Sequence, residues 1–374
     1  MAEARSAPDA SRRPAVFLVG AFPPPVHGLS KVNQAMADLL AGQARIVEFD
    51  TAVLARARSS SWHRFSQLRR VGWLVVRFAA LIAVQRPSSI YIGLSGGRGQ
   101  FLDGIFAMIG NALHVPVFFH HHSFRYINKS SRLTRIVFRL AGKATHIALC
   151  AHMATRLKQA YPSSVHETLV LSNAAFFPVA YRQHPRARGT LPLTLGFLSN
   201  ITREKGIFAF FDVLSALESK GLQFSAIIAG PVADAIADEF NAALMHHPHA
   251  RHIGPVSGEE KTKFYQAIDL LVFPSRYENE AEPLTVIEAI ASGVPVIASD
   301  KGCIPSTLRN GGGAFVVDDE RMVGSITELI IKIGNSPDVY ECLSRRAIAS
   351  VIADAPIQNA TLSRLVGMLM QPAR

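Results

Sequence analysis

The sequence predicts an α/β protein built from two parallel, doubly wound sheets. Along almost the whole chain, short apolar runs that match buried strands alternate with segments of helix length, an order typical of a parallel sheet with helices on both faces. A chain of 374 residues is long enough for two such domains. Residues 178–192 hold three prolines and three arginines without a periodic pattern, and we place a linker at 181–192.

Composition restricts the class of protein. Hydrophobic residues make up 49% of the chain and charged residues 18%, which predicts a globular protein rather than a disordered one. Arginine or glycine interrupts the longest apolar stretches, so we expect no membrane-spanning helix, and residues 1–13 have the character of a polar tail. The net charge of +11 favours an anionic partner: a phosphorylated substrate, a membrane surface or nucleic acid.

The N-terminal half has a regular order of elements. We expect strands at 15–21, 46–50, 88–94, within 115–124, 144–150 and 168–172, and helices at 31–41, 64–84, 101–113, 131–142 and 151–161. A turn containing prolines and Gly28 joins the first strand to the first helix. Such a turn can bring backbone N–H groups against an anion, or it can be a plain connection, and the sequence leaves both interpretations open.

The segment 56–85 combines arginines with aromatic residues. It contains Arg56, Arg58, Arg64, Arg69, Arg70 and Arg77, interleaved with Trp62, Phe65, Trp73 and Phe78. A basic helix with aromatic residues fits contact with a membrane surface. The alternative is a helix of the sheet domain that buries its apolar residues and solvates its arginines. Both interpretations can hold if the N-terminal end of the helix faces the membrane.

Three consecutive histidines follow the apolar part of the strand within 115–124. Side chains alternate along a strand, so His120 and His122 should share one side. We expect no metal there, because no acidic or cysteine ligands cluster nearby in the sequence.

The C-terminal half repeats the alternating order. We expect strands at 193–198, 224–229, 252–256, 270–273, 294–298 and 315–317, and helices at 207–221, 233–245, 259–267, 284–292, 320–334, 337–350 and 357–370. Lys205 precedes Gly206 at the start of the helix 207–221. A lysine in that position can meet a diphosphate with both its ammonium group and the helix dipole.

The stretch 277–299 organises the second domain. Its acidic cluster follows the strand 270–273, and Pro283 and Gly293 occupy positions where a helix begins and ends. The cluster therefore lies outside the carboxyl end of a strand, where open α/β sheets bind ligands. Glu288 falls inside an otherwise apolar helix, so it is either exposed or held for a ligand hydroxyl.

The two glutamates carry a family resemblance. Glu280 and Glu288 are separated by seven residues and followed by Ala-x-Ala-x-Gly-x-Pro-Val-Ile-Ala, a pattern that resembles the E-x7-E signature of family 4 glycosyltransferases. These are retaining, nucleotide-sugar-dependent enzymes of the GT-B fold. The chain departs from the family at Ala281, Glu282 and Pro283, where Gly-Phe-Gly is usual.

The resemblance implies an arrangement of domains. Two Rossmann-like domains, at 14–180 and 193–355, would face a central cleft. A terminal helix at 356–374 would cross back and pack on the N-terminal domain.

The resemblance also implies roles for residues of the second domain. Glu288 would hold the ribose hydroxyls of the donor, and Glu280 would lie near the donor sugar. The diphosphate would be bound by Lys205 and by the first-turn N–H groups of the helix that starts after Pro283, at Leu284 and Thr285. Ser199 and Asn200 stand where the family has its Gly-Arg pair, so the arginine of that pair is missing, and Arg203 is a candidate replacement for it.

In the first domain, the resemblance places Gly28 against the donor and acceptor, and a histidine beside the transferred sugar. His122 matches that histidine better than His120 does. No metal cofactor is implied.

We therefore expect a retaining enzyme that moves a hexose or N-acetylhexosamine from a UDP- or GDP-sugar to an acceptor hydroxyl. The expected acceptor is a lipid-linked or polysaccharide-precursor glycan, and the expected location is cytoplasmic, at the inner face of an anionic membrane. A GT-B-like nucleotide-sugar epimerase or hydrolase is the alternative. A nucleic-acid partner is not expected, because no recognised nucleic-acid-binding motif appears.

Overall fold

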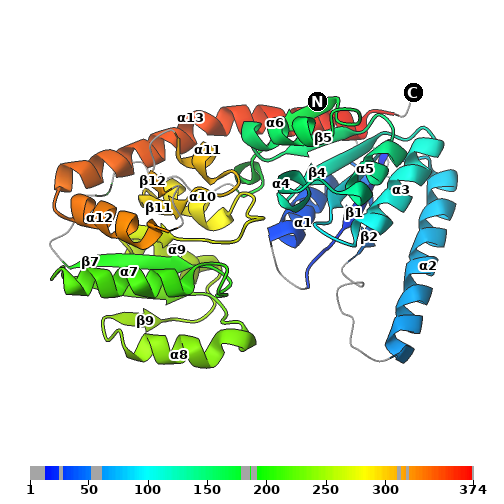
Figure 1. Ribbon diagram of the computed structural model, residues 1–374. Helices are drawn as coiled ribbons and strands as arrows, with labels where there is room; N and C mark the ends of the chain where they lie inside the picture. The colour runs from blue at the N-terminus through cyan, green and yellow to red at the C-terminus, as the bar shows by residue number, and fades with distance from the viewer. Residues whose placement is uncertain are drawn as a thin grey trace, which may run out of the picture. The chain divides into compact units, whose positions relative to one another are not determined.

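The computed structural model describes residues 13–24, 28–51, 61–177, 186, 192–309, 313–316 and 320–372. Two compact units make up the chain (Figure 1). One comprises Met1–Phe177 together with Gln358–Arg374, and the other comprises Pro178–Ile357. Most of the expected linker, and residues 1–12 of the expected tail, lie outside the described residues.

The first unit contains a six-stranded parallel sheet in the order β2-β1-β3-β4-β5-β6. Its strands are β1 (Ala15–Gly20), β2 (Arg45–Asp50), β3 (Ser89–Leu94), β4 (Val117–His121), β5 (Thr145–Ala148) and β6 (Glu167–Val170). Its helices are α1 (Gly28–Ala41), α2 (Ser61–Gln85), α3 (Gln100–Ala112), α4 (Arg125–Asn128), α5 (Arg132–Leu140) and α6 (Ala151–Ala160). A short 3₁₀ turn, Asn173–Ala175, follows β6.

Strand β1 is buried on both faces, which explains its unbroken apolar sequence. Phe17 points to one face, where it packs with Phe49 and Phe78 at ring-centroid distances of 5.2 and 5.7 Å. Leu18 points to the other face and belongs to a core that includes Met36 of α1. The alternation of side chains along the strand thus gives β1 a hydrophobic core on each face.

The second unit contains a six-stranded parallel sheet in the order β12-β11-β10-β7-β8-β9. Its strands are β7 (Leu193–Leu198), β8 (Phe224–Ala229), β9 (Ala250–His252), β10 (Leu270–Phe273), β11 (Val296–Ser299) and β12 (Gly313–Val316). Its helices are α7 (Ile207–Ser219), α8 (Ala237–Met245), α9 (Gly258–Ala267), α10 (Leu284–Ala291), α11 (Ile304–Leu308) and α12 (Met322–Gly334), with a 3₁₀ turn at Asp234–Ile236. The prediction of two parallel-sheet α/β domains is confirmed.

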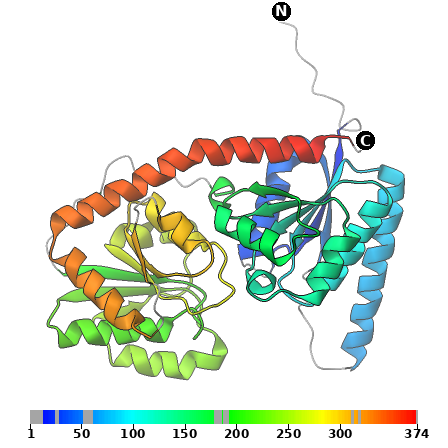
Figure 2. The same cartoon turned by 45° about the horizontal axis from the view of Figure 1, so that its top comes forward.

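The end of the chain differs from the prediction. We expected separate helices at 337–350 and 357–370, but a single helix, α13 (Pro337–Met370), runs through Pro356 (Figure 2). A proline inside a helix removes one backbone donor, but apolar residues on both sides of it are buried: Ala347 and Ile348 in the second unit, and Leu365 and Leu369 in the first. The last residues of the helix pack in the core of the N-terminal unit.

Two smaller differences have local causes. The strand expected at 252–256 is β9, at Ala250–His252, and Gly254 follows it with a φ of +75°, a left-handed conformation that no strand adopts. The helix expected from 233 begins with the 3₁₀ turn Asp234–Ile236, and the α-helical part starts at Ala237. Among the described residues, no helix is long and apolar enough to cross a membrane.

Candidate active site

The loops after β7 and β10 bring two of the predicted site residues into contact. The Nζ of Lys205 lies 2.6 Å from the Oε2 of Glu280, and the hydroxyl of Ser275 donates to the same oxygen at 3.0 Å. The Lys205 side chain is 23% exposed and that of Glu280 is 8% exposed. The two residues are 75 positions apart in the chain, and the central strands β7 and β10, which lie next to each other, bring them together.

Gly206 explains how Lys205 reaches this position. Its φ is +83°, and a Cβ atom there would lie 1.9 Å from the carbonyl oxygen of Pro274. The start of α7 therefore packs directly on the backbone at the end of β10, which only glycine permits. The neighbouring lysine is held over the rings of Phe273 and Tyr277, at 5.9 and 5.1 Å.

The loop that carries Glu280 is fixed from β11 and from the start of α11. The hydroxyl of Ser299 donates to the carbonyl of Ser275 at 2.6 Å, and the N–H of Cys303 donates to the carbonyl of Ala281 at 2.8 Å. At Gly302, where φ is +56°, a Cβ atom would lie 2.2 Å from the carbonyl oxygen of Glu280. These contacts hold the loop in one conformation before α10 begins.

Helix α10 starts after Pro283, as predicted. The N–H groups of Leu284 and Thr285 belong to its first turn, where no preceding helical carbonyl is available to them. They therefore form, with the positive end of the helix dipole, a place that favours an anion.

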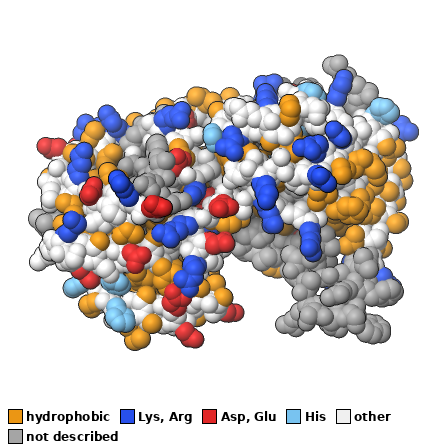
Figure 3. Space-filling view, in the orientation of Figure 1, with side chains coloured by type: hydrophobic (Ala, Val, Ile, Leu, Met, Phe, Trp, Pro, Cys, Tyr) orange, Lys and Arg blue, Asp and Glu red, His pale blue; other side chains and the backbone are white. Residues whose placement is uncertain are grey.

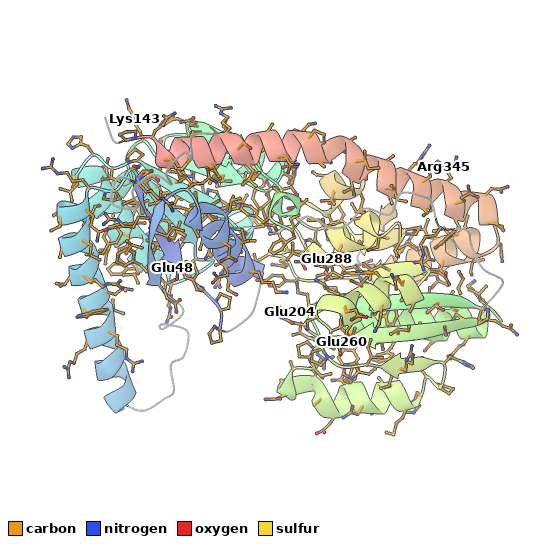
Figure 4. The ribbon with its side chains drawn as sticks, turned by 180° about the vertical axis from the view of Figure 1, so that it is seen from behind. Glu48, Lys143, Glu204, Glu260, Glu288 and Arg345 are labelled. Atoms are coloured by element: carbon orange, nitrogen blue, oxygen red, sulfur yellow. The ribbon has the colours of Figure 1, made fainter. Side chains whose placement is uncertain are left out.

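Glu288 lies one turn further along α10. Its side chain is 12% exposed; it forms an ion pair with Lys261 and accepts a 2.9 Å hydrogen bond from the hydroxyl of Tyr265. Burial and the Glu288 carboxylate raise the pKa of Tyr265 well above its usual range. Glu288 is thus not a solvated residue on an apolar helix. Figure 4 labels it together with Glu204, the neighbour of Lys205, at the same edge of the second unit.

Asn200 and Arg203 lie on the same loop as Lys205, but they are exposed. The Arg203 guanidinium pairs with Glu239 of α8 and lies 4.7 Å from the ring centroid of Phe208. Its contacts are therefore made with α7 and α8, while those of Lys205 are made with the loop after β10. A role for Arg203 beside the diphosphate stays a prediction.

The histidines of β4 lie in the first unit. The rings of His120 and His122 are 4.1 Å apart, so they share one side of the strand, as expected. His120 is fully buried and its Nδ1 lies 2.5 Å from the hydroxyl of Tyr91. His122 follows the last strand residue and is half-buried. Of the two, His122 has the exposure that contact with a substrate requires.

Gly28 is the first residue of α1 and is exposed. A Cβ atom built on it would meet nothing within 4 Å, so packing within the chain does not require glycine there. The residues 25–27 of the same turn lie outside the described residues.

Three site residues were not predicted from the sequence: Ser275, Lys261 and Tyr265. Lys261 and Tyr265 are four positions apart on α9, so they share one face of that helix. This spacing was a usable signal, but nothing in the sequence shows that the face meets α10. Among the described residues, no group of three or more His, Cys, Asp or Glu side chains could hold a metal ion.

Known proteins resemble this chain in both sequence and structure. Residues 184–350 match the sequence profile of the family described as "Glycosyl transferases group 1". The 2-deoxystreptamine N-acetyl-D-glucosaminyltransferase of Niallia circulans is 28% identical over 43% of this chain and 41% of its own length. The lipopolysaccharide core biosynthesis mannosyltransferase LpsB of Rhizobium meliloti is 34% identical over 34% of this chain and 37% of its own. The chain thus matches less than half the length of these curated relatives.

Among solved structures, HepE of Anabaena in complex with UDP and glucose superposes with a TM-score of 0.66 at 16% identity, over 95% of this chain and 100% of HepE. Sucrose-phosphate synthase of Thermosynechococcus elongatus gives a TM-score of 0.68 at 16% identity, over 95% and 99%. The chain has the fold of the GT-B glycosyltransferases. Within it, residues 184–350 form a domain of the glycosyl transferases group 1 family.

Proposed function

We propose that the protein is a retaining glycosyltransferase that moves a hexose or N-acetylhexosamine from a nucleotide diphosphate sugar to an acceptor hydroxyl. The observation that carries this proposal is the contact between Lys205 and Glu280 at the carboxyl edge of the sheet, inside a glycosyl transferases group 1 domain. The UDP and glucose in the HepE structure support a donor of this kind.

The donor would bind at the second unit. The ammonium group of Lys205 and the N–H groups of Leu284 and Thr285 offer one point charge and two directed donors to the diphosphate. Glu288, with Lys261 and Tyr265 orienting its carboxylate, would accept from the ribose hydroxyls.

In the transfer, the bond from the anomeric carbon to the diphosphate oxygen breaks, and a bond to the acceptor oxygen forms on the same face. The acceptor proton passes to the departing diphosphate. Lys205 and the N-terminus of α10 would stabilise the charge that develops on that leaving group. Glu280 is held by Lys205 and Ser275, so we assign it to positioning the donor sugar and favour a same-face displacement over a covalent intermediate.

The acceptor is proposed to be a lipid-linked or polysaccharide-precursor glycan held at a membrane. The relative LpsB, named for lipopolysaccharide core biosynthesis, supports an acceptor of this class. A nucleotide-sugar epimerase or hydrolase is not favoured, because the sequence relatives described above are named as transferases.

Thermal unfolding with a panel of UDP-, GDP- and ADP-sugars tests the donor. A ligand that binds the folded state stabilises it by about 2.7 kcal/mol at one hundred times its dissociation constant. One nucleotide class should raise Tm, and Lys205→Ala should reduce that rise, whereas Lys263→Ala, an exposed lysine on α9, should not. A wild-type protein that none of these donors stabilises, and that releases no nucleotide diphosphate in the presence of glycan acceptors, would contradict the proposal.

A further inference from the structure

Helices α2, α3 and α5 expose an unusual amount of apolar surface. Eight of the twelve large hydrophobic side chains that the described residues expose belong to these three helices and their ends. Among them are Trp73 at 62%, Phe101 at 67% and Ile136 at 52% exposure. We call the exposed side of α2, α3 and α5 the basic–apolar face. Figure 3 shows hydrophobic side chains gathered over this part of the first unit, with Lys and Arg side chains beside them.

The core of the unit does not need these side chains. The inner sides of the same helices are already buried: Phe78 of α2 packs against Phe106 of α3 at 4.6 Å, and Gly104 of α3 lies against Val137 of α5. The exposed residues form second stripes at helical spacing. On α3 the stripe runs through Phe101, Ile105 and Met108, the middle residue being half-buried. A helix that is also apolar on its outer side exposes an apolar patch to solvent, and such patches mark sites of contact with a membrane or a partner.

Charge on the basic–apolar face has one sign. The sequences of α2 and α5 contain arginines and no Asp or Glu, and the one acid of α3, Asp103, is buried. Arg132 and Arg139 of α5 are exposed and lie one turn on either side of Ile136. On α2, the Arg77 guanidinium lies 5.6 Å from the ring of Trp73. Arginines that border apolar surface in this way can lay their stems along it and keep their charge outside.

We propose that the basic–apolar face docks on an anionic lipid bilayer. Its aromatic and aliphatic side chains would enter the boundary between headgroups and acyl chains, and its guanidinium groups would bind lipid phosphates. The uniform positive charge distinguishes this partner from an ordinary protein surface, which carries both signs. The apolar centre distinguishes it from nucleic acid, which presents phosphates.

The proposal deepens the proposed function, because it gives the chain a way to reach a membrane-held acceptor. It also moves the membrane contact predicted from the sequence. That prediction rested on the arginines from Arg56 to Arg77 together with Trp62 and Trp73. Residues 52–60, and the side chains of residues 61–68, lie outside what the structure describes. Among the described residues, the exposed apolar side chains include Trp73 but extend further along α2 and onto two helices that the sequence did not single out.

Trp73 is a natural reporter of docking, since the chain has two tryptophans. In a Trp62→Phe variant, Trp73 alone fluoresces, and its high exposure predicts a red-shifted emission in water. Addition of phosphatidylglycerol vesicles at low salt should shift the emission to the blue, and brominated acyl chains should quench it. Phosphatidylcholine vesicles should do neither. Unchanged emission with phosphatidylglycerol would overturn the proposal.

Vesicle sedimentation with matched variants separates the two contributions. Phe101→Ser with Ile136→Ser, and separately Arg132→Glu with Arg139→Glu, should each lower partitioning by about tenfold. The controls are Met245→Ser with Ile253→Ser, and Lys220→Glu with Arg251→Glu, all exposed in the second unit. These should partition like wild type. An equal loss of partitioning in the control variants would show that the protein binds vesicles through its overall charge and hydrophobicity and not through the basic–apolar face.

Two further readouts keep the interpretation clear. At about 0.1 M salt the electrostatic screening length is about 10 Å, so wild type should bind the vesicles more weakly than at low salt. A further rise in salt should release more of the protein from the vesicles. If Phe101→Ser with Ile136→Ser converts a dimer to a monomer in solution while wild type ignores vesicles, a second copy covers the face and the lipid proposal is wrong. Stabilisation by UDP-sugars, measured on the same variants, is independent of vesicles, so failure of the donor site and failure of this face are distinguishable.

Discussion

Glu280 and Glu288 are each held by one lysine and one hydroxyl of the chain itself. Glu280 contacts Lys205 and Ser275, and Glu288 contacts Lys261 and Tyr265. Each carboxylate is therefore oriented by the protein, and a partly buried charge is compensated. At the residue scale, the signature of two glutamates consists of two small networks, one on each side of the start of α10.

Glu288→Gln should weaken nucleotide binding. A hydrogen bond to a charged group contributes roughly 1.5–3 kcal/mol, which corresponds to about 10–150-fold in affinity. Glu260→Gln, at an exposed position of α9, is the matched control and should bind as wild type does. Calorimetric titration with the stabilising nucleotide measures both. Wild-type affinity in Glu288→Gln would remove the ribose role.

We expect His122→Ala to affect sugar transfer and His120→Ala to affect stability. The half-buried His122 is proposed to lie beside the transferred sugar, so its loss should reduce transfer and leave nucleotide affinity and Tm nearly unchanged. His120 is buried against Tyr91, and its loss leaves that hydroxyl without its partner at a cost of about 1–3 kcal/mol. Its variant should therefore lower Tm. A larger transfer defect per folded molecule in His120→Ala would reverse the assignment.

Asp103 predicts a dependence of stability on pH. Burial raises the pKa of this carboxyl to about 7, against 3.8 when unfolded. The folded state therefore favours the protonated acid, so this group's contribution is fully present below pH 3.8 and is lost as the pH rises to 7. Asp103→Asn removes the penalty, which is on the order of 4 kcal/mol. The variant should have a higher Tm than wild type at pH 8, and the two should converge toward pH 4. Parallel Tm curves from pH 4 to 8 would contradict this.

At the scale of elements, helices and loops are placed by a few glycines and by one tolerated proline. Gly206 and Gly302 lie where any side chain would strike a backbone carbonyl, so they fix how the loops at the carboxyl edge pack. Pro356 is unfavourable inside a helix, yet α13 continues through it and is anchored by buried apolar residues more than two turns away on each side, Ile348 and Leu365. Tertiary burial thus overrides a local preference.

Pro356→Ala should stabilise α13. The position is exposed, and alanine restores one backbone hydrogen bond and removes a clash, which together can amount to about 3 kcal/mol. Tm should rise, whereas Ala353→Pro, at a nearby exposed position, should lower it. A fall in Tm for Pro356→Ala would mean that the proline conformation is required by the packing around it.

At the scale of the whole molecule, one helix contributes to the cores of both units. Leu365 and Leu369 of α13 are fully buried in the core of the first unit, although they follow the entire second unit in sequence. The hydroxyl of Ser89 on β3 donates to the carbonyl of Leu369 at 2.7 Å. The hydrophobic core of the first unit is therefore incomplete without the last turns of α13.

Leu369→Ala should destabilise the first unit in particular. Truncation of a buried leucine costs about 2–5 kcal/mol. Hydrogen exchange should accelerate in β1 and β3, while β7 and β10 keep their protection. Ile357→Ala, at an exposed position of the same helix, is the control and should change neither set. Equal acceleration in both units would show that they unfold as one.

The sequence by itself determined the alternation of strands and helices, the two parallel sheets and the place of the candidate site. Buried parallel strands are continuous apolar runs, and Pro283 marks the start of its helix, so these features are local. The tertiary structure decided which side chains meet. Lys205 contacts Glu280 because β7 adjoins β10 in the sheet, and Lys261 contacts Glu288 because α9 meets α10. The order of strands in a sheet cannot be predicted from the local periodicity of the sequence. The basic–apolar face was missed for the same reason: an apolar stripe looks alike in sequence whether it faces the sheet or the solvent, and only packing leaves Phe101 outside and Phe106 inside.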